Sequence, residues 1–146
     1  MTTYASTQAY GGLGTVIAIG SVPIAIGEIT ELPDFMPEWK TVNATNFQSL
    51  AEEFTKTIRS GKSVTVKGNR STADAGQTAA IAAYESTSPD KITITFPKSS
   101  AQTTTGDSIS FNANILGVNF STSPDKQVVF SLTFQQTGVE AFTAGS

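Results

Sequence analysis

Apolar and polar residues alternate along much of the chain. Residues 92–96 read ITITF, and residues 130–134 read FSLTF. A period of two residues is typical of a strand that buries one face. The same alternation, or a short run rich in Val and Ile, predicts the other strands at residues 13–19, 22–30, 39–45, 63–69, 108–120 and 127–136.

The long segment 108–120 changes phase along its length. Apolar residues occupy odd positions up to Ile115 and even positions from Leu116 to Phe120, with Gly117 at the change. A slip of one residue beside a glycine is the pattern of a β-bulge. We therefore expect a bent strand here.

Residues 74–85, DAGQTAAIAAYE, have the composition of a helix. Asp74 stands at the N-cap position, Gln77 stands at the reciprocal capping position, and good helix formers follow. The small alanine face would let this helix lie close against a sheet.

Residues 46–58, NFQSLAEEFTKTI, have a different period from the strands around them. Phe47, Leu50, Phe54 and Ile58 recur at spacings of three and four residues. Ser49 and Glu52 have the spacing of a capping box. This pattern predicts a short amphipathic helix or a helical loop.

The hexapeptide STSPDK occurs at residues 86–91 and again at residues 121–126. Proline fixes the backbone angle that a type I turn needs, and the flanking Ser and Asp side chains bond readily to turn backbone. We expect a turn at each copy, followed by a strand. The upstream segments differ, which argues against a duplicated domain.

Composition excludes several kinds of chemistry. The 146 residues include no Cys and no His, so disulfides, zinc-thiolate sites and imidazole bases are absent. Nine basic and twelve acidic residues disfavour a surface that grips phosphate. The carboxylate pairs Asp34 with Glu38, and Glu52 with Glu53, fit a solvated loop and a solvated helix face. The sequence predicts no enzyme, no metal site and no cofactor.

The length fits one domain, which we place at residues 13–138. Residues 1–12 are polar and end in glycines, and are expected to form a flexible N-terminal arm. Residues 139–146 are expected to form a C-terminal tail, with no further domain. The apolar run 15–27 is too short to span a bilayer, and no signal peptide is expected.

Two groups of large apolar residues fall on predicted connections. Such residues either form a satellite core beneath a loop or a surface for another subunit, and the sequence leaves both readings open. The candidates for a subunit interface are Phe35, Trp39, Phe47, Leu50, Phe54 and Ile58.

The order of segments resembles the tail tube (major tail) protein of long-tailed, non-contractile bacteriophages. The resemblance covers residues 13–138, and no single motif carries it. The matching segments are IGEIT at 26–30, TVNAT at 41–45, EEFTKTI at 52–58, SVTVKGN at 63–69, ADAGQTAAIAAY at 73–84, ITITFP at 92–97 and a closing strand that ends in TG at 137–138.

This resemblance implies a mainly β fold: a two-sheet β-sandwich or partial barrel with one flanking α-helix. It also implies a structural virion protein, made in the host cytoplasm, whose hexameric rings stack into a hollow phage tail tube. The implied partners are further copies of the chain, a tape-measure protein in the lumen, and tail-tip and tail-terminator proteins. DNA would pass through without specific binding, and no membrane would be involved.

A conduit for DNA needs polar walls that do not bind phosphate. Residues 39–45 keep such a face, so the candidates for the lumen are Thr41, Asn43 and Thr45. Family members commonly carry an acidic residue where Asn43 stands, which leaves the charge of the bore open.

Two other classes stay open from the residues alone. A fimbrial or carbohydrate-binding β-sandwich is one. A lectin usually presents aromatic residues near clustered Asp or Asn, an exported adhesin needs a signal peptide, and the sequence shows neither feature. A secretion-system tube protein of similar fold is the other, and its ring-forming demands are alike. The order of segments favours the phage protein.

Overall fold

The computed structural model describes residues 11–146. The N-terminal segment 1–12, predicted to be flexible, therefore lies almost wholly outside the described residues. Within them the fold is mainly β, with two sheets and one helix, as predicted, and the sheets do not close into a barrel. The elements are β1 (Val16–Ile19), β2 (Ile24–Ile26), β3 (Ile29–Glu31), β4 (Glu38–Asn43), β5 (Phe54–Ser60), β6 (Ser63–Asn69), α1 (Ala75–Glu85), β7 (Asp90–Thr95), β8 (Ser108–Ser121) and β9 (Val129–Thr143).

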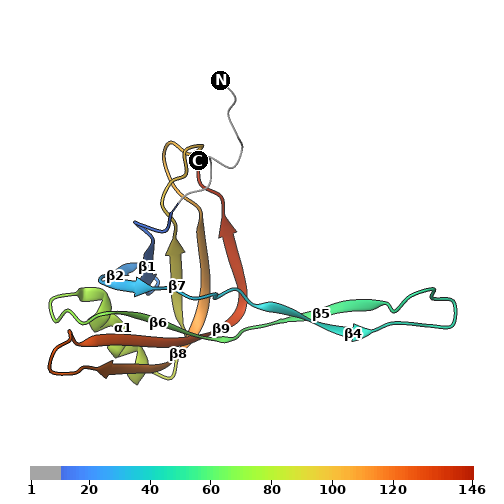
Figure 1. The fold of residues 1–146 in the computed structure, drawn as a ribbon. Coiled ribbons are helices and arrows are strands. Elements are labelled where there is room, and N and C mark those ends of the chain that lie inside the picture. The colour runs from blue at the N-terminus through green and yellow to red at the C-terminus, as the bar shows by residue number, and fades with distance from the viewer. Residues whose placement is uncertain (1–10) are drawn as a thin grey trace.

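Seven strands form the larger sheet in the order β2-β1-β7-β8-β9-β6-β3, with antiparallel neighbours throughout. The long strands β8 and β9 run up one side of the body and bend to run along its lower edge (Figure 1). Register shifts lie between Ser110 and Asn112 and between Ile115 and Gly117. The bulge predicted at Gly117 is therefore confirmed, and it helps to bend the sheet.

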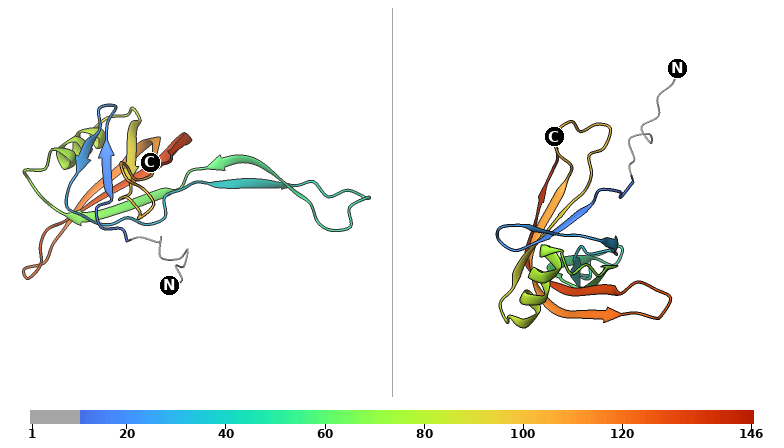
Figure 2. Two further views of the ribbon diagram at one scale, coloured as in Figure 1. Left: turned by 90° about the horizontal axis from the view of Figure 1, so that it is seen from above. Right: turned by 90° about the vertical axis from the view of Figure 1, so that its left-hand side faces the viewer.

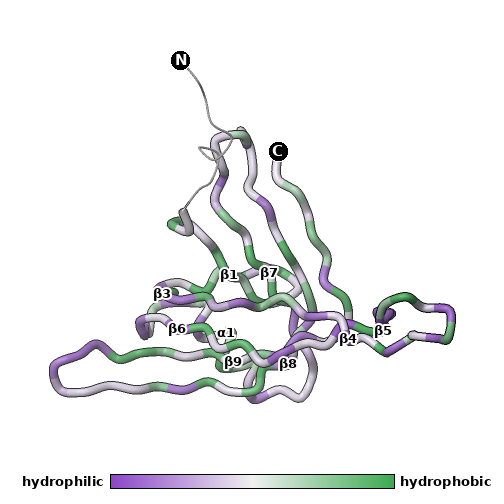
Figure 3. Tube along the Cα trace, turned by 45° about the vertical axis from the view of Figure 1, so that its right-hand side comes forward, coloured by the Kyte–Doolittle hydropathy of each residue, from purple (hydrophilic) through white to green (hydrophobic). Residues whose placement is uncertain are grey.

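The core lies in the concave side of this bent sheet. Hydrophobic and hydrophilic residues alternate along the strands of the body (Figure 3). Each fully buried large apolar side chain stabilises the fold by about 1.5 to 3 kcal/mol. The largest buried side chains are Phe130, Phe134, Ile17, Ile19, Ile92, Ile94, Leu132, Gln77 and Val66.

Helix α1 covers the core with a small-residue face. Ala80 and Ala83 are buried, and a Cβ on Gly76 would lie 2.1 Å from the carbonyl oxygen of Ala25. The predicted helix and its close approach to the sheet are confirmed.

Asp74 is the N-cap, as predicted, and accepts from the Gln77 N–H at 2.8 Å and the Gly27 N–H at 3.0 Å. The reciprocal role predicted for Gln77 is wrong. Its amide is fully buried, donates to the carbonyls of Gly27 and Asn69, and accepts from the Ser71 N–H. Gln77 thus joins the helix to two loops because burial demands partners for its amide.

The run 22–30 is two short strands rather than one. Glu28 has φ of 62°, in the left-handed region that non-glycine residues rarely adopt. Its carbonyl accepts from the Asn69 N–H at 2.8 Å. The chain therefore leaves β2 and crosses to the other edge of the sheet, where β3 pairs with β6.

The helix predicted over residues 46–58 was wrong. Residues 44–53 form a loop, and Phe54–Ser60 form β5, which pairs with β4. The Ser49 and Glu52 capping box is not formed, because the Ser49 hydroxyl donates to the Glu53 carboxylate at 2.8 Å. The cross-strand pairing and the β-branched residues of β5 decide for a strand.

The two STSPDK copies differ in conformation. In the second, the Lys126 N–H donates to the Ser123 carbonyl at 3.0 Å, which closes the predicted turn. In the first, Asp90 and Lys91 already belong to β7 and pair with β8. The first copy thus forms a bend at residues 87–88 without the backbone hydrogen bond of a type I turn, and the strand predicted after it is confirmed.

The last strand is longer than the predicted 127–136. Strand β9 runs to Thr143, so most of the predicted tail at 139–146 belongs to the sheet. Among residues 11–146, no helix has the length and apolar character needed to cross a membrane.

Candidate assembly interface

Strands β4 and β5 and the loop between them, residues 38–60, form what we call the arm. They pair only with each other and project far beyond the body (Figure 2, left). Every residue of β4 is exposed. A two-stranded ribbon on its own is marginally stable in water, so the arm has little to hold it together unless it meets another surface.

The register of the arm assigns side chains to its two faces. Paired residues of an antiparallel ribbon lie on the same face, and residues two apart on one strand do as well. One face, which we call the tryptophan face, carries the pairs Trp39 with Arg59, Thr41 with Lys56, and Asn43 with Phe54. The opposite face carries Val42 with Thr55 and Glu38 with Ser60.

Trp39 is the centre of the tryptophan face near the body. The Lys56 ammonium lies 5.4 Å and the Arg59 guanidinium 5.2 Å from the centroid of its ring. Cations at these distances are attracted to the aromatic face. Trp39 is 46% exposed, so its ring lies on the surface together with these two cations.

The residues predicted for the lumen and those predicted for subunit contacts are not on separate faces. Thr41 and Asn43 share the tryptophan face with Trp39 and Phe54. Thr45 lies outside the strand, where its hydroxyl accepts from the Glu53 N–H at 2.8 Å and its own N–H donates to Asn43 Oδ1 at 2.9 Å. Thr45 therefore helps to close the loop of the arm.

The apolar residues of the arm are on the surface of the protomer. Phe47 and Leu50, in the loop, are fully exposed, and Phe54 and Ile58 are 58% and 63% exposed. Of the two readings left open by the sequence, a satellite core beneath the loop is excluded for this group within one chain. Exposed apolar groups gathered on one element are typical of an interaction surface.

Phe35 was predicted for the same surface, and this was wrong. It is 9% exposed and stacks between Phe96 and Phe111, with ring centroids 6.4 and 6.3 Å apart. Its neighbour Met36 is 39% exposed. The ring therefore belongs to the buried hydrophobic cluster of the body.

The sequence analysis missed an ion pair at the base of the arm. The Arg59 guanidinium donates to the Glu140 carboxylate, and their side chains are 29% and 8% exposed. Burial alone raises the pKa of Glu140, but hydrogen bonds from Gln136 and the backbone, together with Arg59, lower it below its ordinary value. No sequence pattern signals this pair, since its members are 81 residues apart.

It also missed an open sheet edge. Strand β6 pairs with β9 only as far as Gln135, so the later residues of β9 have no strand on that side within the described chain. Val139 and Phe142 of this segment are 69% and 62% exposed. The two apolar residues Val139 and Phe142 in the predicted C-terminal tail were the sequence feature that could have indicated this edge.

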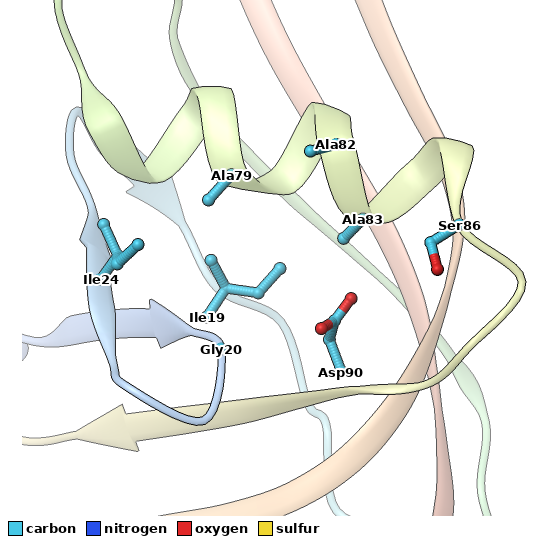
Figure 4. A pocket seen from close by; sticks show the side chains of 8 residues that line it. All are labelled: Ile19, Gly20, Ile24, Ala79, Ala82, Ala83, Ser86 and Asp90. Carbon is cyan, nitrogen blue, oxygen red and sulfur yellow. The ribbon is translucent and has the colours of Figure 1, made fainter.

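A shallow groove lies between α1 and the β1–β2 turn (Figure 4). Small and aliphatic side chains line it, with the Ser86 hydroxyl and the Asp90 carboxylate at one end. The described residues contain no group of three His, Cys, Asp or Glu side chains that could hold a metal ion. The groove offers space but no assembled set of reactive groups.

No protein-family model and no curated protein match the chain. Solved structures do match. The SPP1 tail tube matches with a TM-score of 0.73 at 15% identity, over 94% of this chain and 80% of the other. A chain in the tail of an empty gene transfer agent particle, determined with C6 symmetry, has a TM-score of 0.70 at 16% identity, over 93% and 100%.

Contractile systems are matched as well. A chain of the anti-feeding prophage baseplate, symmetrised six-fold, has a TM-score of 0.71 at 8% identity, over 99% of this chain and 98% of the other. At such low identity the likeness concerns the fold, which extends over nearly the whole length of both chains. The chain has the tail-tube fold.

Proposed function

We propose that this chain is a structural subunit that assembles with copies of itself into a tail tube. The observation that carries the proposal is the arm: a two-stranded ribbon with exposed Trp39, Phe47, Leu50, Phe54 and Ile58. Each exposed phenyl that becomes buried would contribute about 1.5 to 3 kcal/mol. A neighbouring subunit offers that burial at every contact of a repeating assembly.

The open edge of β9 supports the same proposal. An unpaired strand edge exposes backbone N–H and C=O groups, and edges of this kind pair readily with another strand. Joining such edges around a ring closes a barrel and satisfies these groups. The likeness to chains from assemblies solved with six-fold symmetry makes a hexameric ring the preferred form.

The lumen would be lined by uncharged polar residues, for which Thr41, Asn43 and Thr45 are the proposed set. The chain has a net charge of −3, which suits a wall that DNA passes without sticking. Lys56 lies opposite Thr41 on the same face, and its ammonium lies 5.4 Å from the centroid of the Trp39 ring. The apolar members of that face would then contact the adjacent subunit beside the lumen.

In this proposal the protein resides in the virion tail of a long-tailed, non-contractile phage and delivers DNA to the host. A tape-measure protein would fill the lumen before ejection, and tail-tip and tail-terminator proteins would cap the two ends. The role is structural and involves no catalysis.

A tube of a contractile injection or secretion system is the second candidate. The likeness to the anti-feeding prophage baseplate chain favours it, together with a type six secretion system protein at a TM-score of 0.51. Native particles separate the two candidates. Nuclease-protected DNA in intact particles supports the phage tail, whereas particles without DNA and with a contracting sheath support the injection system.

A carbohydrate-binding role has less support from the arm. Sugar binding uses the open face of an aromatic ring, and the Trp39 ring is in contact with two cations. The sequence alone had left this class open.

The proposal is tested by static light scattering of the purified chain from dilute to concentrated solution, with negative-stain microscopy of the same samples. We expect a concentration threshold above which rings or tubes form. A protein that remains monomeric at every concentration, and in the presence of tail-tip proteins, would contradict it.

A further inference from the structure

The arm is tied to the body at few points. Residues 32–37 lead into β4, and residues 61–62 lead from β5 to β6. Within residues 11–146, the Arg59–Glu140 ion pair makes the only hydrogen bond between the arm and the rest of the protein. The direction in which the arm points therefore depends on this pair and on the short connections.

Glu140 is held in place by an irregularity of β9. Between Asn112 and Ser110 of β8, two residues apart, β9 advances four residues, from Thr137 to Ala141. This bulge contains Gly138, with φ of 80°. Bulges redirect side chains, and here the bulge places the Glu140 carboxylate toward the arm.

Gln136 orients the Glu140 carboxylate, which accepts the hydrogen bond from Arg59. Its amide donates to Glu140 Oε2 at 2.8 Å and to the Gly138 carbonyl at 3.2 Å. The carboxylate is thus oriented before Arg59 reaches it. A buried carboxylate with this support binds a guanidinium more firmly than a mobile surface carboxylate does.

Arg59 transmits the contact into the arm. Its guanidinium touches Glu140 on one side and lies over the Trp39 ring of the partner strand on the other. Arginine combines ion pairing and aromatic stacking in one planar group, which lysine does not. Both strands of the arm are therefore linked to β9 through one side chain.

Gly61 keeps the base of the arm tight against β9. A Cβ at this position would lie 2.4 Å from the Gln136 carbonyl oxygen, and the Gly61 carbonyl accepts from the Gln135 amide at 3.1 Å. The chain returns from the arm to the body at this point of close contact. A small rotation here would swing the whole arm.

We infer that the Arg59–Glu140 pair, supported by Gln136 and Trp39, is a positioning device that fixes the arm for docking onto a neighbouring subunit. Its role in docking rests on the proposed function, while its role in directing the arm does not. A subunit whose arm is already oriented loses less conformational entropy when it binds. Without the pair the body stays folded and the arm swings.

The test uses the absence of cysteine in the chain. Spin labels are placed at Leu50→Cys in the arm loop and Asp125→Cys in the β8–β9 turn, both exposed, and the distance distribution is measured in dilute protomer. We expect a narrow distribution for the parent and a clearly broader one for Glu140→Gln. An equally narrow distribution in a folded Glu140→Gln protein would overturn the inference.

Two further variants make the result specific. The charge swap Arg59→Glu with Glu140→Arg should narrow the distribution in part, because it restores the ion pair but not the contact of Arg59 with the Trp39 ring. Lys56→Gln removes the other cation on Trp39 but not the pair, and should leave the distribution narrow. If Glu140→Gln fails to fold, Arg59→Met is measured in its place against the same criterion. If the swap does not narrow the distribution at all, the ion pair does not direct the arm.

Assembly is measured separately. Because a swinging arm must be ordered on docking, Glu140→Gln should raise the concentration threshold for assembly on the order of tenfold. An unchanged assembly threshold together with a broadened distance distribution would overturn the docking role alone. A parent protein that never assembles would refute the proposed function and leave the result on arm direction standing.

Discussion

Asn43 lies directly opposite Phe54 in the β4–β5 pair, so the arm presents an amide and an exposed phenyl ring side by side. A polar group next to an apolar one is what a surface needs where a subunit contact meets a wetted channel. In the proposed tube, this relationship would place the boundary between subunit contact and lumen within one face of the arm.

The first prediction concerns Phe54. Because the side chain is 58% exposed in the protomer, Phe54→Asp should change the free energy of unfolding by less than about 0.5 kcal/mol. The same change should abolish assembly, since a charge would have to be buried at each contact. Thermal melting and microscopy measure the two effects.

The matched control for Phe54 is Tyr84→Asp on α1, an aromatic residue that is 49% exposed. It should melt normally and still assemble. An early melt of Phe54→Asp would contradict its place on the surface, and tubes formed by that variant would remove it from the interface.

The second prediction concerns the bore. Replacing Thr41 and Asn43 with Lys adds two charges per subunit, or about twelve in a ring of six, and should slow DNA passage in a salt-dependent way. The matched control is Val42→Lys, which places a charge on the opposite face. Intact tails with delayed, salt-sensitive ejection are expected for the double variant alone.

The result also divides the tryptophan face. If the Thr41 and Asn43 variant forms no tails, these residues belong to the subunit contact rather than the lumen. If tails eject DNA at the parent rate, the residues face neither DNA nor a contact.

The third prediction concerns Phe35. Since its ring stacks between Phe96 and Phe111, Phe35→Ala should destabilise the protomer by about 3 to 5 kcal/mol. Met36→Ala, next in the chain and 39% exposed, should cost much less. Urea denaturation measures both, and equal midpoints for the two variants would contradict the core position of Phe35.

The fourth prediction concerns acid. Burial raises the pKa of Glu140, but hydrogen bonds from Gln136 and the backbone, together with Arg59, lower it below its ordinary value of 4.5, so these contacts stabilise the folded form fully above that value. The contribution is lost as the pH falls through the lowered pKa, when the carboxyl becomes neutral. The charged group paired with Glu140 in the described chain is Arg59 on β5, and Gln136 on β9 is neutral.

Other carboxyls also titrate in acid, so the quantity to follow is the difference in unfolding free energy between the parent and Glu140→Gln. Stability of the parent minus that of Glu140→Gln, followed from pH 7 downward, should shrink only below about pH 4.5, the ordinary carboxyl range. A difference that stays constant into strong acid would show that Glu140 gains nothing from its charge.

The sequence predicted those elements whose signals are local. Helix α1 has its cap at Asp74, and the bulge has its glycine at Gly117. The helix prediction for residues 46–58 failed because Phe47 and Leu50 have helical spacing but are exposed and face no core in this chain. An apolar period predicts a helix only where a surface of the same protein lies opposite, and here the pairing with β4 prevailed.

The candidate interface was predictable in part. Large apolar residues on connections marked the arm, but Phe35 and Phe54 look alike in sequence and only the fold separates buried from exposed. The Arg59–Glu140 pair depends on a bulge in one strand and a crossing by another. Such contacts between distant segments have no trace in a single sequence.

Electron cryomicroscopy of the concentrated protein, or of native tails, would show directly whether the arm docks on a neighbouring subunit. We predict stacked rings in which the arm lies against an adjacent subunit, with Trp39 and Phe54 buried there although they are 46% and 58% exposed in the protomer. Tubes whose arms extend freely into solvent, or a chain that forms no repeating assembly under any condition, would contradict assembly through the arm.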